Sequence, residues 1–114
     1  MPYPSLKIFG AVVIAASLAA CTGAGRWERA DEFVAGLQCG MSADEITRYS
    51  QQFSDTVVYS PGASNLPDLV VEHRGTKVAC WLDKNGLHSV EVSWISAPMK
   101  LTTEPKKEIC SRAQ

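Results

Sequence analysis

The feature that most constrains this chain is an uncharged apolar run near its start, Ile8–Ala16, which follows one positive side chain, Lys7. The run is shorter than the roughly 20 apolar residues that a membrane-spanning helix needs. Small residues follow it, in the order Leu18-Ala19-Ala20, ahead of Cys21. A positive residue, a short apolar core and a small-residue site are typical of a secretory signal. Residues 1–20 are therefore predicted to be a signal peptide, which leaves a small domain that begins at Cys21.

The order Leu18-Ala19-Ala20-Cys21 resembles the lipobox of bacterial lipoproteins. The resemblance implies that Cys21 receives a covalent diacylglycerol and a fatty acid such as palmitate, and becomes the new N-terminus after cleavage. The alternative is a plain signal peptide with a chance cysteine. Thr22 after the lipid cysteine, in place of aspartate, is compatible with sorting to the outer membrane. We therefore expect a lipid-anchored protein of the outer membrane that faces the periplasm, with residues 21–25 as the tether.

Charge and cysteine usage limit the chemistry of the remaining chain. The formal net charge is −1 and the basic residues form no patch, so no nucleic-acid partner is expected. Of the four cysteines, three remain besides Cys21. An exported chain lies where disulfides persist, which predicts one structural disulfide with one thiol left over. The spacings typical of zinc sites do not occur, so neither a metal nor another cofactor is expected.

Two amphipathic helices of roughly three turns are predicted in the first half of the domain. Apolar residues at spacings of three and four form one stripe from Trp27 to Leu37, which favours a core position for Trp27 over the membrane interface. Gly40 suits the left-handed residue that follows a helix end. Ser42 and Glu45 have the spacing of a capping box, which predicts that a second helix begins there.

The second half of the domain is predicted to form antiparallel strands. We expect a short strand at 56–59 and a meander of three strands at 69–73, 77–82 and 87–95, separated by turn residues. The tail from Ala97 to Gln114 holds prolines and few apolar residues, and no regular structure is predicted there.

The turn Asp83-Lys84-Asn85-Gly86 admits two alignments of the strands on either side. A two-residue Asn-Gly loop is one, and a type I turn closed by a glycine bulge is the other. The second alignment is preferred because it places the apolar residues of both strands on one face, and a sheet with one buried face specifies its register strongly. The pairs that it predicts are Val78 with Val92, Cys80 with Val90, and Leu82 with His88.

These elements predict an α+β domain over residues 26–96, with two N-terminal helices packed on one face of a three-stranded antiparallel meander and the strand at 56–59 as a candidate fourth. In the preferred register Cys80 points toward the helices, and Cys39 lies at the turn between them. A Cys39–Cys80 disulfide is therefore favoured. The rival is Cys39–Cys110, which would fix the tail of residues 97–114.

The segment from Gly40 to Ile46, Gly-Met-Ser-Ala-Asp-Glu-Ile, follows a helix and precedes a three-stranded meander. It resembles the Gly-Met-Thr/Ser-x-x-Glu-Val turn of the SmpA/OmlA (BamE-like) outer-membrane lipoproteins, whose layout also occurs in the β-lactamase-inhibitor-like fold. The Leu-Gly-x-Pro that this family carries after its second helix is absent, and Phe53-Ser54-Asp55-Thr56 stands there. The resemblance implies a protein-binding or scaffold module in envelope assembly or integrity. An inhibitor of a secreted hydrolase, such as a β-lactamase or a lysozyme, is the alternative.

Trp81 is the candidate residue for binding a partner protein. The preferred register places it on the sheet face away from the helices, and tryptophan is enriched at binding hot spots. The alternative is that the loop at 60–65 or the tail covers it. His73 and His88 are expected to be separate histidines at strand ends, because the middle strand lies between theirs. The chain has none of the common catalytic motifs, so neither catalysis nor a small-molecule substrate is expected.

Overall fold

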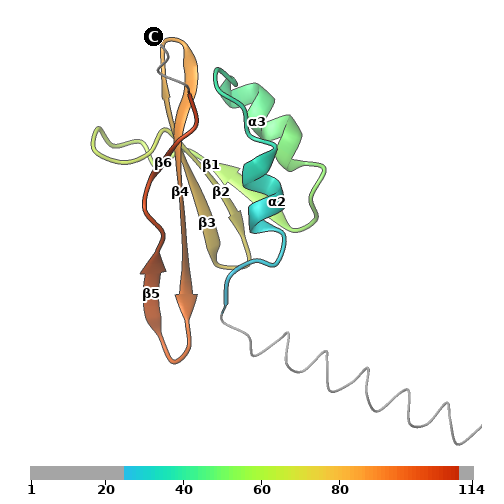
Figure 1. Ribbon diagram of the computed structural model, residues 1–114, viewed down its shortest axis with the longest axis vertical. Helices are drawn as coiled ribbons and strands as arrows, with labels where there is room; N and C mark the ends of the chain where they lie inside the picture. Colours follow the sequence, from blue (N-terminus) through green and yellow to red (C-terminus); the bar gives the residue numbers. More distant parts are fainter. Residues whose placement is uncertain (1–24, 111–114) are drawn as a thin grey trace, which may run out of the picture.

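The computed structural model describes residues 25–110. The predicted signal peptide and Cys21 therefore lie outside the described residues. Two short helices, α2 (Ala30–Ala35) and α3 (Ala43–Ser50), lie to one side of an antiparallel sheet of six strands (Figure 1). The strands are β1 (Thr56–Tyr59), β2 (Leu69–His73), β3 (Thr76–Asp83), β4 (Gly86–Ser96), β5 (Lys100–Thr103) and β6 (Lys107–Glu108).

This architecture corrects the prediction of two helices on a three-stranded meander. Strands make up 40% and helices only 16% of the described residues, so the sheet dominates the fold. The tail beyond Ala97, which was predicted to be irregular, supplies β5 and β6. Both pair with β4, on the edge that β3 leaves free. The open edge of β4 would present unpaired N–H and C=O groups, and the backbone of the tail supplies their hydrogen-bond partners. Because this pairing uses the backbone, the side-chain composition of the tail does not indicate it.

The first helix is shorter than the apolar stripe predicted. Trp27 lies before α2, and its backbone N–H donates to Thr76 Oγ1 of β3 over 2.8 Å. This hydrogen bond holds Trp27 against the sheet, so the helix does not begin until Ala30. Arg29 at the N-terminus of α2 provides no side-chain cap, and the helix ends at Gly36. Trp27 is nevertheless in the core, as predicted, with 8% of its surface exposed.

The second helix begins as the capping box predicts. The Ser42 hydroxyl accepts a hydrogen bond from the Glu45 backbone N–H at 3.1 Å, and the Glu45 carboxylate accepts one from the Ser42 N–H at 2.8 Å. These two bonds satisfy N–H groups that have no partner within the helix. At two turns, α3 is shorter than the three turns expected.

The strands follow one another across the sheet in the order β1-β2-β3-β4-β5. Val78 pairs with Val92 and Cys80 with Val90, as the preferred register predicts. Near the turn the register shifts between Trp81 and Leu82, so that Leu82 pairs with Leu87 and not with His88. The extra residue of β4 is therefore His88, between Leu87 and Ser89, whereas Gly86, at φ 99°, pairs with Asp83 and is not itself the predicted bulge.

The core lies between the helices and the sheet. Phe33 of α2 and Ile46 of α3 are fully buried against strand residues such as Val71 and Val90. Phe33 stacks on Tyr49 with ring centroids 5.0 Å apart, and the Tyr49 hydroxyl donates to the Phe33 carbonyl over 3.0 Å. The two helices are therefore joined by aromatic packing as well as by their connecting turn.

The turn between the helices is hydrogen-bonded to the start of β4. The Gly40 N–H donates to the Leu87 carbonyl, and the Leu87 N–H donates to the Met41 carbonyl, each over 2.9 Å. Gly86 packs so closely on Gly40 that an added Cβ would overlap the Gly40 carbonyl. Cys39 is therefore fixed at the end of the sheet, beside the β3–β4 turn.

Candidate functional site

The face of the sheet opposite the helices carries the predicted partner-binding residue, Trp81. Because successive strand residues point to opposite faces, Trp81 and Ala79 lie on this face while Cys80 lies in the core. Through strand pairing, Val57 and Tyr59 of β1 belong to the same face. Glu91 pairs with Ala79 and lies on this face as well. We call this surface the outer face; its members are Val57, Tyr59, Ala79, Trp81 and Glu91.

The tail partly covers Trp81. Lys106 lies just before β6, and its Nζ is 3.8 Å from the centroid of the Trp81 ring. A cation over an aromatic face is attracted by the ring quadrupole. The indole is half-buried, and its neighbour across the strand, Ser89, is fully buried. The tail thus covers Trp81 in part, and the part that stays exposed leaves its role in binding a partner as a prediction.

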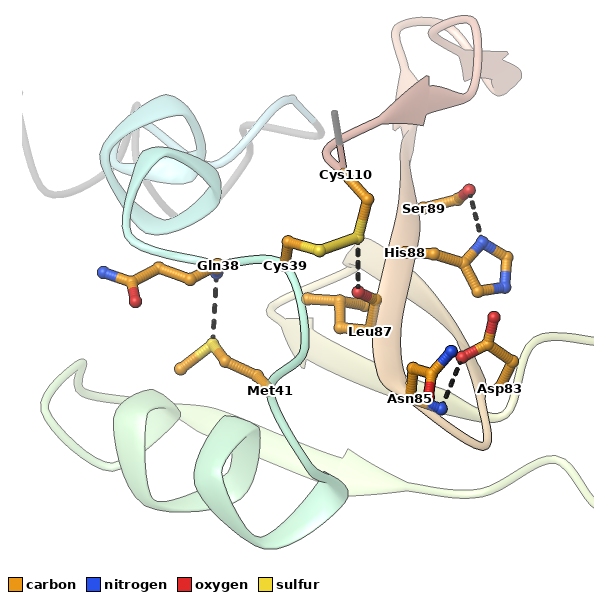
Figure 2. Close-up of a disulfide and its surroundings, with 9 residues drawn as sticks. All are labelled: Gln38, Cys39, Met41, Asp83, Asn85, Leu87, His88, Ser89 and Cys110. Carbon is orange, nitrogen blue, oxygen red and sulfur yellow. Dashed lines mark hydrogen bonds between the residues drawn. A yellow bond between two sulfur atoms is a disulfide. The ribbon is translucent and has the colours of Figure 1, made fainter. Parts of the chain in front are cut away.

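A disulfide fixes the tail at this position (Figure 2). Cys39 is bonded to Cys110, with Cα atoms 4.9 Å apart, and the Cys110 sulfur lies 3.2 Å from the Leu87 carbonyl oxygen. The Ile109 N–H donates to the His88 carbonyl over 3.0 Å, so the tail is hydrogen-bonded to β4 next to the bridge. The pairing is that of the predicted rival.

The favoured Cys39–Cys80 pairing is therefore wrong. Cys39 is held beside Leu87 at the end of the sheet, whereas Cys80 pairs with Val90 further along the strands. Cys80 is a free thiol that is fully buried in the core. Burial raises the pKa of this thiol to about 12, because the apolar surroundings disfavour the thiolate. Its environment is that of an inert core residue.

The two histidines lie apart, as the meander predicts. His73 ends β2, where its ring stacks on Trp27 with centroids 4.4 Å apart and its Nδ1 lies 3.0 Å from the Ser54 carbonyl oxygen. His88 lies at the other end of the sheet, with Nδ1 2.8 Å from Ser89 Oγ. His88 and Asp83 of the β3–β4 turn line one hollow at this end of the sheet. Among residues 25–110, no group of three or more His, Cys, Asp or Glu side chains is arranged to hold a metal ion.

Arg26 joins the first described residues to the tail. Its guanidinium forms ion pairs with Asp31 at 2.6 Å and Glu104 at 2.8 Å, and it lies over the ring of Trp94 in β4 at 5.4 Å. The hydrogen bond to Asp31 is the main reason that the pKa of Arg26 is raised, and it lowers the pKa of Asp31. A cavity of about 240 Å³ lies beside this cluster. Its arginine is already neutralised by two carboxylates, so it offers little attraction to an anionic ligand.

The sequence interpretation missed one exposed apolar feature, the β4–β5 hairpin. Met99 is 83% exposed, Leu101 65% and Ile95 36%. The signal in the sequence is the stretch from Val92 to Thr103, which carries a single charge, Lys100. The prolines and the scarcity of apolar residues beyond Ala97 favour an irregular tail, so Ile95 and Leu101 are not assigned to one hairpin from the sequence.

Comparisons of the chain with protein-family models, with curated proteins and with solved structures found no match. Within the part of the chain that the structure describes, no helix has the length and apolar character needed to span a membrane.

Proposed function

We propose that this protein is an outer-membrane lipoprotein, anchored through Cys21, whose domain binds other envelope proteins and serves as a scaffold in envelope assembly or integrity. The observation that carries the binding role is the outer face. The helices cover the other side of the sheet, while this side presents Trp81 together with Val57 and Tyr59.

The chemistry of the outer face suits a protein partner. Val57 is 62% exposed although it lies in a strand, and Tyr59 presents a ring whose hydroxyl donates to Glu72 over 3.2 Å. Aromatic side chains with a polar rim are enriched at the centres of protein interfaces. β1 also ends the sheet, so its outer backbone groups are open to pairing with an added strand.

Affinity purification of the tagged protein from detergent-solubilised membranes tests the binding role. We expect envelope proteins to co-purify with the native chain and to be depleted at least tenfold with Trp81→Ala, because hot-spot truncation costs about 2 kcal/mol or more. Lys84→Ala, an exposed residue of the β3–β4 turn that does not belong to the outer face, is the control and should leave recovery unchanged. Recovery of a soluble hydrolase in place of envelope proteins would support an inhibitor and contradict the scaffold role.

The anchor is tested separately. Cys21→Ser should move the protein from the membrane fraction to the soluble periplasmic fraction, since the diacylglycerol has no other attachment point in the lipobox. Mass spectrometry of the N-terminal peptide of the native protein should show the acyl groups. Retention of Cys21→Ser in the membrane fraction, together with an unmodified native peptide, would contradict anchoring through this residue.

A further inference from the structure

We infer that the tip of the β4–β5 hairpin, residues 95–101, docks into the lipid surface beside the anchor. This inference rests on the proposed anchoring at Cys21, and it adds a second membrane contact and a fixed orientation of the domain.

The tip extends beyond the rest of the sheet. β3 pairs with β4 only as far as Lys77 and Ser93, whereas β5 pairs with β4 from Ser93 to Ser96. The end of the hairpin is therefore a two-stranded ribbon without a third strand (Figure 1). Such a ribbon is marginally stable by itself in water, and contact with another surface stabilises it.

The side chains of the tip are those of a membrane-interface contact. Ile95 and Leu101 pair across the strands on one face, and Met99 lies in the connecting loop. Exposed apolar side chains at the end of a ribbon suit shallow burial at the boundary between headgroups and acyl chains. Lys100, the only charged residue between Val92 and Thr103, can keep its ammonium group at the headgroups while its stem is buried.

The chain enters the domain at the same end. Arg26 lies over Trp94, so the first described residues are held against the base of the hairpin. In Figure 1 the start of the described chain and the β4–β5 tip lie at one end of the molecule, and the β3–β4 turn lies at the other. From Trp94 to the end of β4 at Ser96 the strand covers about 7 Å, and the loop that carries Met99 lies beyond it.

The tether is long enough for this projection. A fully extended chain from Cys21 to Gly25 spans at most about 14 Å. A lipid on Cys21 would thus hold Gly25 within about 14 Å of the membrane, and this reach exceeds the roughly 7 Å of strand between Trp94 and Ser96. The occupant that the geometry favours is therefore the membrane itself, because an anchored domain brings the tip to the lipid surface without any further partner.

Site-specific fluorescence on the membrane-extracted full protein tests this docking. Met99→Cys, labelled with an environment-sensitive dye, is reconstituted into vesicles of phosphatidylethanolamine and phosphatidylglycerol. We expect a blue-shifted emission and at least twofold quenching by lipids that carry a spin label near the headgroup. Cys80 should not compete for the dye because it is buried, and Cys39 and Cys110 are bonded to each other.

Two controls make the result specific. Lys84→Cys, labelled at the opposite end of the domain, should remain in water and be quenched only by a soluble quencher. Leu101→Asp in the Met99→Cys background should restore an aqueous signal, whereas Leu66→Asp, at an exposed apolar site in the loop between β1 and β2, should not.

The outcomes separate this inference from the proposed anchor. An aqueous Met99 label on a protein whose N-terminal peptide carries lipid would overturn the docking and leave the anchor intact. A lipid-quenched label on a chain without lipid at Cys21 would support the docking and overturn the anchor. A label that is shielded before vesicles are added would indicate contact with a second copy and would contradict a lipid occupant.

Discussion

Cys80 is the free thiol of residues 25–110, and its burial gives the protein a measurable pH dependence. In the unfolded chain the thiol has a pKa near 9.0, and in the folded protein the pKa is about 12. Between these values the unfolded chain releases a proton that the folded protein keeps, so raising the pH stabilises the unfolded state. The contribution of Cys80 is present below pH 9 and is lost as the pH rises toward 12.

We therefore expect the free energy of unfolding to fall more steeply above pH 9 in the native protein than in Cys80→Ala, by up to about 1.4 kcal/mol per pH unit. Urea unfolding at pH 8, 9 and 10 measures both slopes, and a non-reducing gel verifies that the Cys39–Cys110 bond stays intact. Other groups, such as Tyr49, contribute equally to the pH dependence of the free energy of unfolding in both proteins, so their contributions cancel when the two slopes are subtracted. Equal slopes would mean that the thiol reaches water in the folded state.

Thr76 is a buried residue whose hydroxyl stabilises the fold through one hydrogen bond. It is fully buried, and its Oγ1 accepts the Trp27 N–H over 2.8 Å. Thr76→Val keeps the shape but leaves that N–H without a partner, which costs about 1–3 kcal/mol of stability. Thr103→Val, at an exposed strand position, is the control and should change stability by no more than about 0.5 kcal/mol. Chemical denaturation of the two variants tests this; equal effects would contradict the role of the buried bond.

Among the elements, β6 depends most on a covalent restraint. It contributes only Lys107 and Glu108 to the sheet, and the Cys39–Cys110 bond follows directly. The bond joins residues 71 apart in sequence, and the entropic model gives about 4 kcal/mol for a loop of this size. Cys110→Ala should destabilise the domain by about 2–5 kcal/mol, and it should remove the protection of β6 amides from hydrogen exchange.

Cys39→Ala provides the matching test of this pair. If the bond is the whole effect, either single variant and the double variant should lose the same stability, because the second substitution has nothing further to break. A double variant that is clearly less stable than both single variants would instead show that one of the side chains has a separate packing role. Reduction of the native protein should give the same loss as either variant.

The success of the sequence predictions differed from element to element for physical reasons. α3 and the strands β2, β3 and β4 were predictable because local signals specify them: a capping box at Ser42, alternating apolar residues, and a turn that ends at Gly86. β5 and β6 were not, because they form by pairing with the free edge of β4 and depend little on their own composition. The length of α2 was overestimated, since the hydrogen bond between Trp27 and Thr76 is a tertiary contact that helical periodicity does not contain.

At the scale of the whole molecule, the candidate site was predictable only in part. The strand register placed Trp81 on the outer face, and that assignment held because alternation is fixed once the core face is known. The contact of Lys106 with Trp81 and the Cys39–Cys110 pairing both depend on where the tail folds, which few local signals indicate. The hairpin tip was missed because its apolar residues form one exposed patch only in the folded structure, where they lie together at one end of the molecule.

The ends of the domain therefore have different roles in the proposed arrangement, with the hairpin tip toward the lipid and the disulfide end away from it. This orientation predicts how the protein should respond to a longer tether. Inserting about 20 flexible Gly/Ser residues between Thr22 and Gly25 lengthens the tether of about 5 residues roughly fivefold, which lowers the effective concentration of the tip at the membrane about tenfold by the −3/2 power of tether length. A tip with enough lipid affinity of its own tolerates this loss. Most of the docking should then persist.

We expect a dye on Met99→Cys to remain blue-shifted in this extended-tether variant, with lipid quenching reduced by less than about threefold, because a tip that is mostly docked on the short tether keeps much of its contact at an effective concentration about tenfold lower. In the same extended chain, Leu101→Asp should release the tip and return the dye to an aqueous spectrum. The short-tether protein with Leu101→Asp supplies the comparison, since its anchor still confines the domain near the surface. If lengthening the tether alone abolished the blue shift, proximity enforced by the anchor would account for the contact, and the hairpin would have no lipid affinity of its own.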